Sequence, residues 1–364
     1  MRGKAEMLGY LRDWFQRRFS DPNAITLTLL LLIGFGLIIF FGTVLAPILV
    51  AIALAYLLEW PVNRLQRVGL KRLYAVLVVF TLFITLFFVF VFFLIPVIWQ
   101  QSVNLLAELP QIAQAWREMM ESVEEIAPTF IDASQIQMFT DKVNDRLLAL
   151  GQTILERSWN TLMLLAVLLV YMIIVPLLVF FMLKDKVLLL EHFNRVLPEQ
   201  RRLISQVGSE MNLQIMNYIR GKALEIVIVG VVSYGVFYLF DLRYSALLAT
   251  LVGFSVLVPY IGAAVVTIPI ALVGLFQFGP SMTLFWLIFA YGIIQALDGN
   301  VLVPILFSEA VALHPVYIIA AVLIFGAMWG FWGVFFAIPL ASLVKAVITA
   351  LSTRVEEARN GEAN

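Results

Sequence analysis

The sequence predicts an all-α polytopic membrane protein, with some broken or re-entrant helices and an amphipathic helical insertion on the external side. Of its 364 residues, 62% are hydrophobic and only 13% are charged, whereas a soluble domain is about half apolar and a quarter charged. Apolar runs of about eighteen or more residues, long enough to span a bilayer, recur along the chain. The alternating pattern of membrane-barrel strands is absent.

The charge balance and the residue inventory exclude several functions. The formal net charge is zero, so no basic excess indicates nucleic acid as a partner. The chain has no cysteine, which excludes disulfides and thiol chemistry. With only His192 and His314, a zinc site built from histidine and cysteine is not expected. We expect no cofactor and no enzyme, because no nucleophile–base pair stands out. The pattern GxxxxGK[ST] of ATP-driven proteins is also absent.

The first two segments are residues 1–23 and 24–99. Residues 1–23 form a basic amphipathic stretch, which predicts a cytoplasmic interfacial helix, with a frayed tail as the alternative. About twenty polar residues precede the first apolar run, so a cleavable signal peptide is not expected. Residues 24–58 are too long for one span and have basic residues on both sides. We therefore expect two short helices with a tip near residue 43, followed by one aromatic-rich span over 73–98.

The next two segments are an insertion at 100–158 and a region at 159–222. The insertion is net acidic, which favours the external side, and its apolar periodicity predicts two amphipathic helices joined around Pro128. Each helix must bury its apolar side against the other helix, the membrane surface or a neighbouring subunit. Residues 159–222 are expected to span inward and to continue as a basic cytoplasmic helical loop.

Residues 223–350 form the second membrane part, and 351–364 a cytoplasmic tail. Two runs in this part, 246–277 and 312–346, are overlong and interrupted by Gly and Pro, so they either cross fully or re-enter. Residues 261–273 (IGAAVVTIPIALV) are similar to 332–344 (WGVFFAIPLASLV). Paired Gly/Pro-interrupted segments indicate discontinuous helices around a substrate site, although chance similarity is a competing explanation. An even number of segments leaves both termini cytoplasmic.

A polar cluster inside the apolar run 282–307 is the strongest functional signal. Gln295, Asp298 and Asn300 fall within six positions, although unpaired polar groups are costly in a bilayer. Gln295 and Asp298 share a helix face, and Gly299 loosens the helix before Asn300. An ionisable residue inside the membrane indicates a functional site by default. The alternative is a polar knot that only fixes helix packing.

Several stretches carry a resemblance to a known family. They are 18–22 (RFSDP), 54–61 (LAYLLEWP), 218–222 (YIRGK), 253–262 (GFSVLVPYIG), 295–300 (QALDGN), 313–315 (LHP) and 330–339 (GFWGVFFAIP). The chain resembles the autoinducer-2 exporter family of permeases over nearly its whole length. The resemblance implies a bacterial inner-membrane protein of about eight hydrophobic segments. It also implies a homo-oligomer, with a pentamer known in the family, and secondary transport of the elevator type.

The leading hypothesis is a proton-coupled secondary transporter of a small polar solute, such as autoinducer-2, or of a cation. Its candidate path residues are Pro259, Tyr260, Gly262, Gln295, Asp298, Asn300, Pro304, His314, Pro315, Gly330 and Gly333. A second candidate group, for gating, consists of Arg220, Lys222 and Glu225, where a local Lys222–Glu225 ion pair is the simpler interpretation. A non-transporting scaffold and a passive channel are the alternatives.

Overall fold

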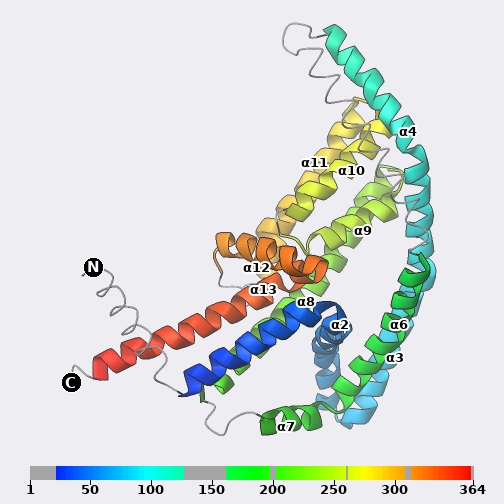
Figure 1. Ribbon diagram of the computed structural model, residues 1–364. Coiled ribbons are helices and arrows are strands. Elements are labelled where there is room, and N and C mark those ends of the chain that lie inside the picture. Colours follow the sequence, from blue (N-terminus) through cyan, green and yellow to red (C-terminus); the bar gives the residue numbers. More distant parts are fainter. Residues whose placement is uncertain (1–21, 127–160, 197–201, 260, 308–312, 362–364) are drawn as a thin grey trace, which may run out of the picture. The chain divides into compact units, whose positions relative to one another are not determined.

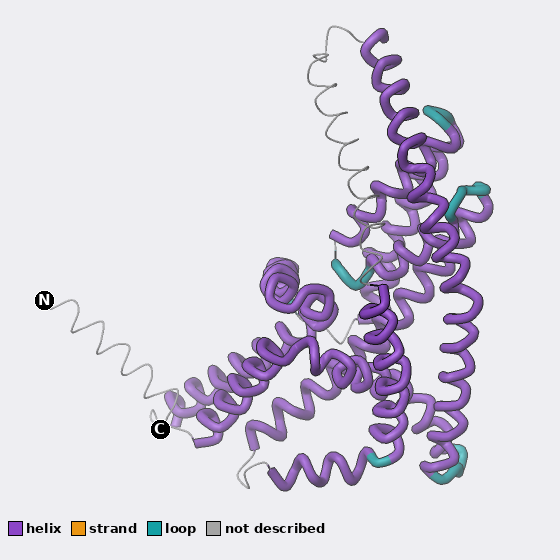
Figure 2. Tube along the Cα trace, turned by 45° about the vertical axis from the view of Figure 1, so that its right-hand side comes forward, coloured by secondary structure: helices purple, strands orange, loops and turns teal. Residues whose placement is uncertain are grey.

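The computed structural model describes residues 22–126, 161–196, 202–259, 261–307 and 313–361, and these ranges contain helices and loops but no strand (Figure 2). The predicted all-α membrane fold is confirmed, because the described ranges include six helices that are long and apolar enough to cross a membrane. The elements are α2 (Pro22–Arg67), α3 (Arg72–Val89), η1 (Phe90–Leu94), α4 (Ile95–Ile126), α6 (Thr161–Lys184), α7 (Lys186–Val196), α8 (Arg202–Leu239), α9 (Ser245–Ser255), α10 (Ile261–Phe278), α11 (Met282–Leu297), η3 (Asp298–Leu302), α12 (Val303–Phe307) and α13 (Pro315–Gly361).

The chain divides into two compact units, each assembled from separate stretches of sequence. Unit 1 comprises Met1–Leu77, Val175–Lys222 and Phe307–Asn364. Unit 2 comprises Val78–Ile174 and Ala223–Leu306. The boundaries fall inside α3, α6, α8 and α12, so single helices contribute residues to both units.

The predicted pair of short helices before residue 58 is wrong. Instead, α2 is one α-helix of 46 residues with Pro47 inside it, and Figure 1 shows that it bends partway along. A proline inside a helix removes one hydrogen bond and crowds the carbonyl four residues earlier, here Thr43, which kinks the helix. The interruption that suggested a turn near residue 43 therefore bends the helix without ending it.

The predicted aromatic span 73–98 is helical throughout, but it does not stop at its expected end. It comprises α3, the π-helical turn η1 and the start of α4, which continues to Ile126. The first amphipathic helix of the predicted insertion is thus the direct extension of the span. The second one lies outside the described residues, as do residues 1–21.

Both overlong runs of the second membrane part are helical hairpins. In unit 2, α9 ends at Ser255 and α10 begins at Ile261. In unit 1, α13 reverses at Gly330, whose φ of 62° and ψ of −137° are not helical. The 11-residue α9 is about 16 Å long and the first arm of α13, residues 315–329, about 22 Å. Both are shorter than a bilayer core of about 30 Å, which favours re-entry over crossing.

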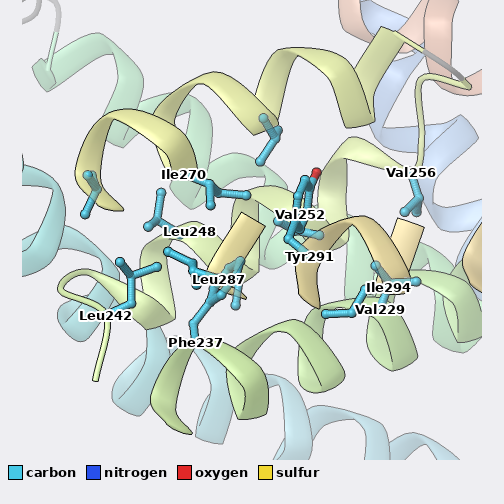
Figure 3. Packing of buried hydrophobic residues seen from close by; sticks show 13 residues of the cluster. Val229, Phe237, Leu242, Leu248, Val252, Val256, Ile270, Leu287, Tyr291 and Ile294 are labelled. Atoms are coloured by element: carbon cyan, nitrogen blue, oxygen red, sulfur yellow. The ribbon is translucent and has the colours of Figure 1, made fainter. Parts of the chain in front are cut away.

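The core of unit 2 gathers apolar side chains from α8, α9, α10 and α11 (Figure 3). Phe237, Leu248, Ile270 and Leu287 have no exposed surface and point toward one another in Figure 3. On α11 the buried side continues from Leu287 through Tyr291 and Ile294. This side leads directly to the polar cluster.

Candidate functional site

The polar cluster lies where α11 changes into a π-helix. Gln295 is in the last turn of α11, and Asp298 and Asn300 are in η3. In η3 the N–H of Val303 donates to the carbonyl of Asp298, five residues earlier. Pro304 explains the change, because it has no N–H and its ring crowds the carbonyl of Asn300, so the preceding turn widens. The π-helical turn is thus the local result of placing Pro304 after this sequence.

The same effect occurs at η1, which supports this explanation. There the N–H of Ile95 donates to the carbonyl of Phe90, and Pro96 follows. In both turns the proline comes one residue after the last donor of the π-helix. The sequence around η1 is apolar and aromatic, whereas η3 contains a carboxylate and an amide, so only η3 combines this geometry with polar chemistry.

Two of the three polar residues come together on the buried side of α11. Tyr291, Gln295 and Asp298 follow one another at successive turns, and Tyr291 is only 2% exposed. The Nε2 of Gln295 and the Oδ1 of Asp298 are shielded from solvent, and this Nε2 has no hydrogen-bond partner in the described part of the chain. An unsatisfied buried donor costs about 1–3 kcal/mol. The arrangement therefore holds polar groups that packing alone does not require.

Asn300 does not join the other two. Its side chain is exposed, and its Nδ2 donates to the carbonyl of Ala296 at 2.8 Å. The amide thus satisfies a backbone acceptor of its own helix near the π-helical turn. Pro304, also exposed, acts through the backbone as described above.

The tip of the α9–α10 hairpin is linked to α11 by Tyr291. Its hydroxyl donates to the carbonyl of Ala263, in the first turn of α10, at 3.2 Å. Gly262, one residue earlier, lies so close to the carbonyl of Ser255 that a Cβ there would overlap this oxygen. Pro259 is half-buried in the turn, and Tyr260 lies outside the described residues. Sequence reasoning missed Tyr291, although it precedes Gln295 by one helical turn.

The candidate residues of α13 have clear local roles. His314 is exposed, and its Nδ1 accepts the N–H of Val316 at 3.3 Å, so it caps the start of α13, with Pro315 as the first helical residue. Gly330 forms the reversal. Gly333 is buried against the carbonyl of Phe325, where a Cβ would overlap the oxygen. A path role for these residues stays a prediction.

The candidate gating residues all lie on α8. Lys222 and Glu225 are 6% and 2% exposed, and the Lys222 Nζ is 5.2 Å from the centre of the Phe307 ring, a cation–π distance. Arg220 interacts electrostatically with Glu59, and its Nε is buried without a hydrogen-bond partner among the described residues. The local Lys222–Glu225 ion pair and the gating role stay predictions.

Sequence reasoning missed an ion cluster around Glu59 in unit 1. Its carboxylate, in a residue only 8% exposed, accepts from Arg72 at 3.2 Å and from Lys186 at 2.9 Å. Arg72 also donates its Nε to the carbonyl of Leu183 at 3.0 Å. The cluster, which we call the Glu59 cluster, joins α2, α3, α6 and α7. Its signal in the sequence is that Glu59 is the only acidic residue between Asp21 and Glu108.

A second polar cluster fixes the base of the α9–α10 hairpin in unit 2. Gln277 accepts the N–H of Arg243 and donates to the carbonyl of Asp241, both at 2.7 Å. Arg243 also pairs with Glu108 at 3.4 Å. Burial, followed by a hydrogen bond to Glu108, raises the pKa of Tyr244 to about 12. These contacts hold a turn in which Asp241 and Tyr244 both have positive φ.

A groove of about 490 Å³ lies along the outer side of α11, away from the polar cluster. Its lining is apolar and aromatic and includes Met282, Trp286, Phe289 and Ile293. These four side chains are 45–73% exposed, as expected for a surface that faces lipid. Among the described residues, no group of three or more His, Cys, Asp and Glu side chains is placed to hold a metal.

Comparisons with known proteins agree with this architecture. Residues 25–353 match the family described as "AI-2E family transporter". The chain is 52% identical over 345 residues to the Escherichia coli (strain K12) protein named "Putative permease PerM", covering 94% of this chain and 98% of that protein. It is 25% identical over 307 residues to "Putative transport protein YrrI" of Bacillus subtilis (strain 168), covering 84% and 86% of the two chains. By this match the chain, an all-α polytopic membrane protein, belongs to the AI-2E family of transporters.

Proposed function

We propose that the protein is a secondary transporter of the bacterial inner membrane that exchanges protons for a small polar solute, such as autoinducer-2, or for a cation. The observation that carries the proposal is that the shielded Gln295 Nε2 and Asp298 Oδ1 lie one helical turn apart at the end of the buried side of α11. A carboxylate and an unsatisfied amide are costly there, and such groups inside a membrane commonly serve a solute or ion path. The membership in a transporter family supports this conclusion.

Asp298 is the proton carrier in this proposal. A carboxylate that passes between dry and wet surroundings exchanges a proton, because its charged form is strongly disfavoured away from water. Gln295 supplies neutral hydrogen bonds to the solute or an oxygen to a cation. The π-helical turn contributes as well, because Pro304 cannot donate to the carbonyl of Asn300, which leaves this oxygen without its regular helical donor.

The two hairpins supply the moving parts in this proposal. Short arms that enter and leave on one side can shift against neighbouring helices without unfolding a full span. Tyr291 connects the tip of the α9–α10 hairpin to the helix of the polar cluster. Movement of the tip would therefore shift the position of Gln295. We further propose that both termini lie in the cytoplasm. We also propose that the protein is a homo-oligomer, and a mass measurement in detergent would test for a pentamer.

The experiment that tests the proposal is reconstitution in vesicles with an imposed pH gradient and a screen of small polar solutes and cations. Wild-type protein should move at least one of them in response to the gradient, and Asp298→Asn should lose this response. Asn300→Ala is the matched control, because Asn300 is exposed and bonds only to its own helix in the contacts described. Downhill flux without pH dependence would indicate a passive channel, and no flux of any solute would favour a scaffold.

A further inference from the structure

Helix α7 exposes apolar side chains immediately after the apolar helix α6. Only Asp185 separates the two helices, and Lys186–Val196 forms α7. Val187, Leu188, Leu189 and Leu190 are each at least 49% exposed. Four exposed aliphatic residues in a row need an apolar environment, because leaving them in water would forgo about 1.5–3 kcal/mol for each large side chain.

In α7, Leu189 and Leu190 lie opposite the charged residues of its second half, whereas Val187 and Leu188 lie on the charged side. Leu189 and Leu190 lie next to each other on one side of the helix. Glu191 and Arg195 lie on the opposite side, and both are exposed. An amphipathic helix with low net hydrophobicity is typical of the membrane–water interface.

The position of α7 identifies the bilayer as the surface that covers it. α6 is apolar along its length and ends at Lys184, which is where a membrane-entering helix meets the headgroups. Lys186, the first residue of α7, is fixed at the same level by its 2.9 Å ion pair with Glu59. Figure 1 shows that α7 then turns away from the direction of α6. Its apolar side thus begins at the membrane boundary, where lipid is already present.

We propose that α7 is an interfacial helix that docks on the membrane surface at which α6 ends. Leu189 and Leu190 enter the boundary between headgroups and acyl chains, and Arg195 faces the headgroups and water. Lys184 and Lys186 add an attraction to anionic lipid, since basic residues near an anionic surface favour binding. The docking holds the Glu59 cluster at the level of the membrane surface, independently of what the protein transports.

The absence of cysteine from the chain makes a direct test simple. Leu189→Cys and the matched control Arg195→Cys are each spin-labelled in the full-length protein and placed in lipid nanodiscs. Collisions with oxygen report exposure to lipid, and collisions with a water-soluble nickel complex report exposure to water. We expect the label at 189 to meet oxygen more than nickel, and the label at 195 to show the reverse. Both sites are exposed, so the labels should not disturb folding.

Two results would overturn the proposal. Equal and high nickel exposure at both sites would place α7 in water. Shielding of the 189 label from both reagents would indicate that protein, such as a second copy of the chain, covers this side. Nanodiscs with and without anionic lipid provide a second measurement. Anionic lipid should lower the nickel exposure at 189, and an increase would contradict the role given to Lys184 and Lys186.

Discussion

The hairpin of unit 2 and the hairpin of unit 1 share their packing but not their turn. In unit 2 the chain leaves α9 at Ser255 and enters α10 at Ile261, whereas in unit 1 it reverses at Gly330 alone. In each hairpin a glycine early in the second arm, Gly262 or Gly333, lies against a carbonyl at the end of the first arm. The two stretches of similar sequence, 261–273 and 332–344, therefore have the same local contact.

A tyrosine fixes each hairpin in the same way. Tyr291 donates to the carbonyl of Ala263 at 3.2 Å, and Tyr218 donates to the carbonyl of Phe335 at 3.3 Å. The acceptors lie one and two residues after Gly262 and Gly333. Tyr291 belongs to the helix that continues into Gln295 and Asp298. Tyr218 belongs to α8, which continues into the charged residues Arg220, Lys222 and Glu225. The two hairpins thus share their local contacts and differ in the polar groups that follow the tyrosine, an amide and a carboxylate after Tyr291 and several charged side chains after Tyr218.

The largest effect is expected from filling the glycine contact. Gly262→Ala and Gly333→Ala each place a Cβ onto a backbone oxygen, so the arms must separate, at an expected cost of about 3 kcal/mol of stability. Thermal unfolding in detergent measures it. The control is Gly292→Ala on α11, where a Cβ meets nothing within 4 Å and stability should be unchanged or slightly higher. If only one hairpin variant is destabilised, the two contacts are not equivalent.

The Glu59 cluster gives the next effect, confined to unit 1. Glu59→Gln leaves Arg72 and Lys186 without their carboxylate, but both cations are partly exposed, with side chains at 25% and 43%. We therefore expect a loss of about 2 kcal/mol, below the 3–5 kcal/mol of a fully buried pair. Unfolding monitored in detergent measures the loss. An unchanged midpoint would show that solvent replaces the carboxylate, and that the cluster does not hold α2, α3 and α7 together.

Removing the tyrosine hydroxyls sharpens the comparison of the hairpins. Tyr291→Phe and Tyr218→Phe should each cost about 1 kcal/mol, because a part-buried carbonyl loses one donor. The two variants should differ in their transport rates. Tyr291→Phe should reduce flux more than Tyr218→Phe, because Tyr291 lies on the helix of the polar cluster. Flux at equal amounts of folded protein is the measurement. A larger loss of flux in Tyr218→Phe would move the functional site toward unit 1.

The smallest effect concerns the base of the unit 2 hairpin at high pH. The pKa of Tyr244 is raised from 10.0 to about 12, so the neutral phenol is favoured in the folded protein. Its contribution to stability is complete below pH 10 and is lost as the pH rises toward about 12. Tyr244→Phe should remove this part of the pH dependence, read as the difference between the two unfolding curves. Parallel curves from pH 9 to 12 would contradict the raised pKa of Tyr244.

The sequence was sufficient for the fold class and for the main breaks in it. Apolar runs and their interruptions predicted the membrane helices, the turn before Gly262 and the break near Gly330, because these depend on local composition and backbone freedom. The prediction of two short helices before residue 58 was wrong because of Pro47. A proline can either bend a helix or lie at its end, and the packing of neighbouring helices determines the outcome. Pro304 produces a π-helical turn that was not predicted. The sequence indicated only that Gly299 loosens the helix at this point.

The parts of the candidate site that depend on distant contacts were not predictable. The pairing of Glu59 with Lys186 joins positions 127 residues apart in the chain, and the bond from Tyr291 to Ala263 joins two helices. One sequence contains no signal for such pairs beyond the rarity of the charge. For Asn300 the sequence predicted a contact that the structure does not show. Its amide was expected to join Gln295 and Asp298, but it donates to the carbonyl of Ala296 on its own helix.

The most direct test of the central claim, that Asp298 couples transport to protons, is a measurement of proton movement in sealed vesicles. A pH-sensitive dye inside the vesicles records protons released when the identified solute is added on one side. Wild-type protein and Asn300→Ala should both give a solute-dependent pH change, and Asp298→Asn should give none at equal protein content. A pH change of wild-type size in Asp298→Asn would contradict the account.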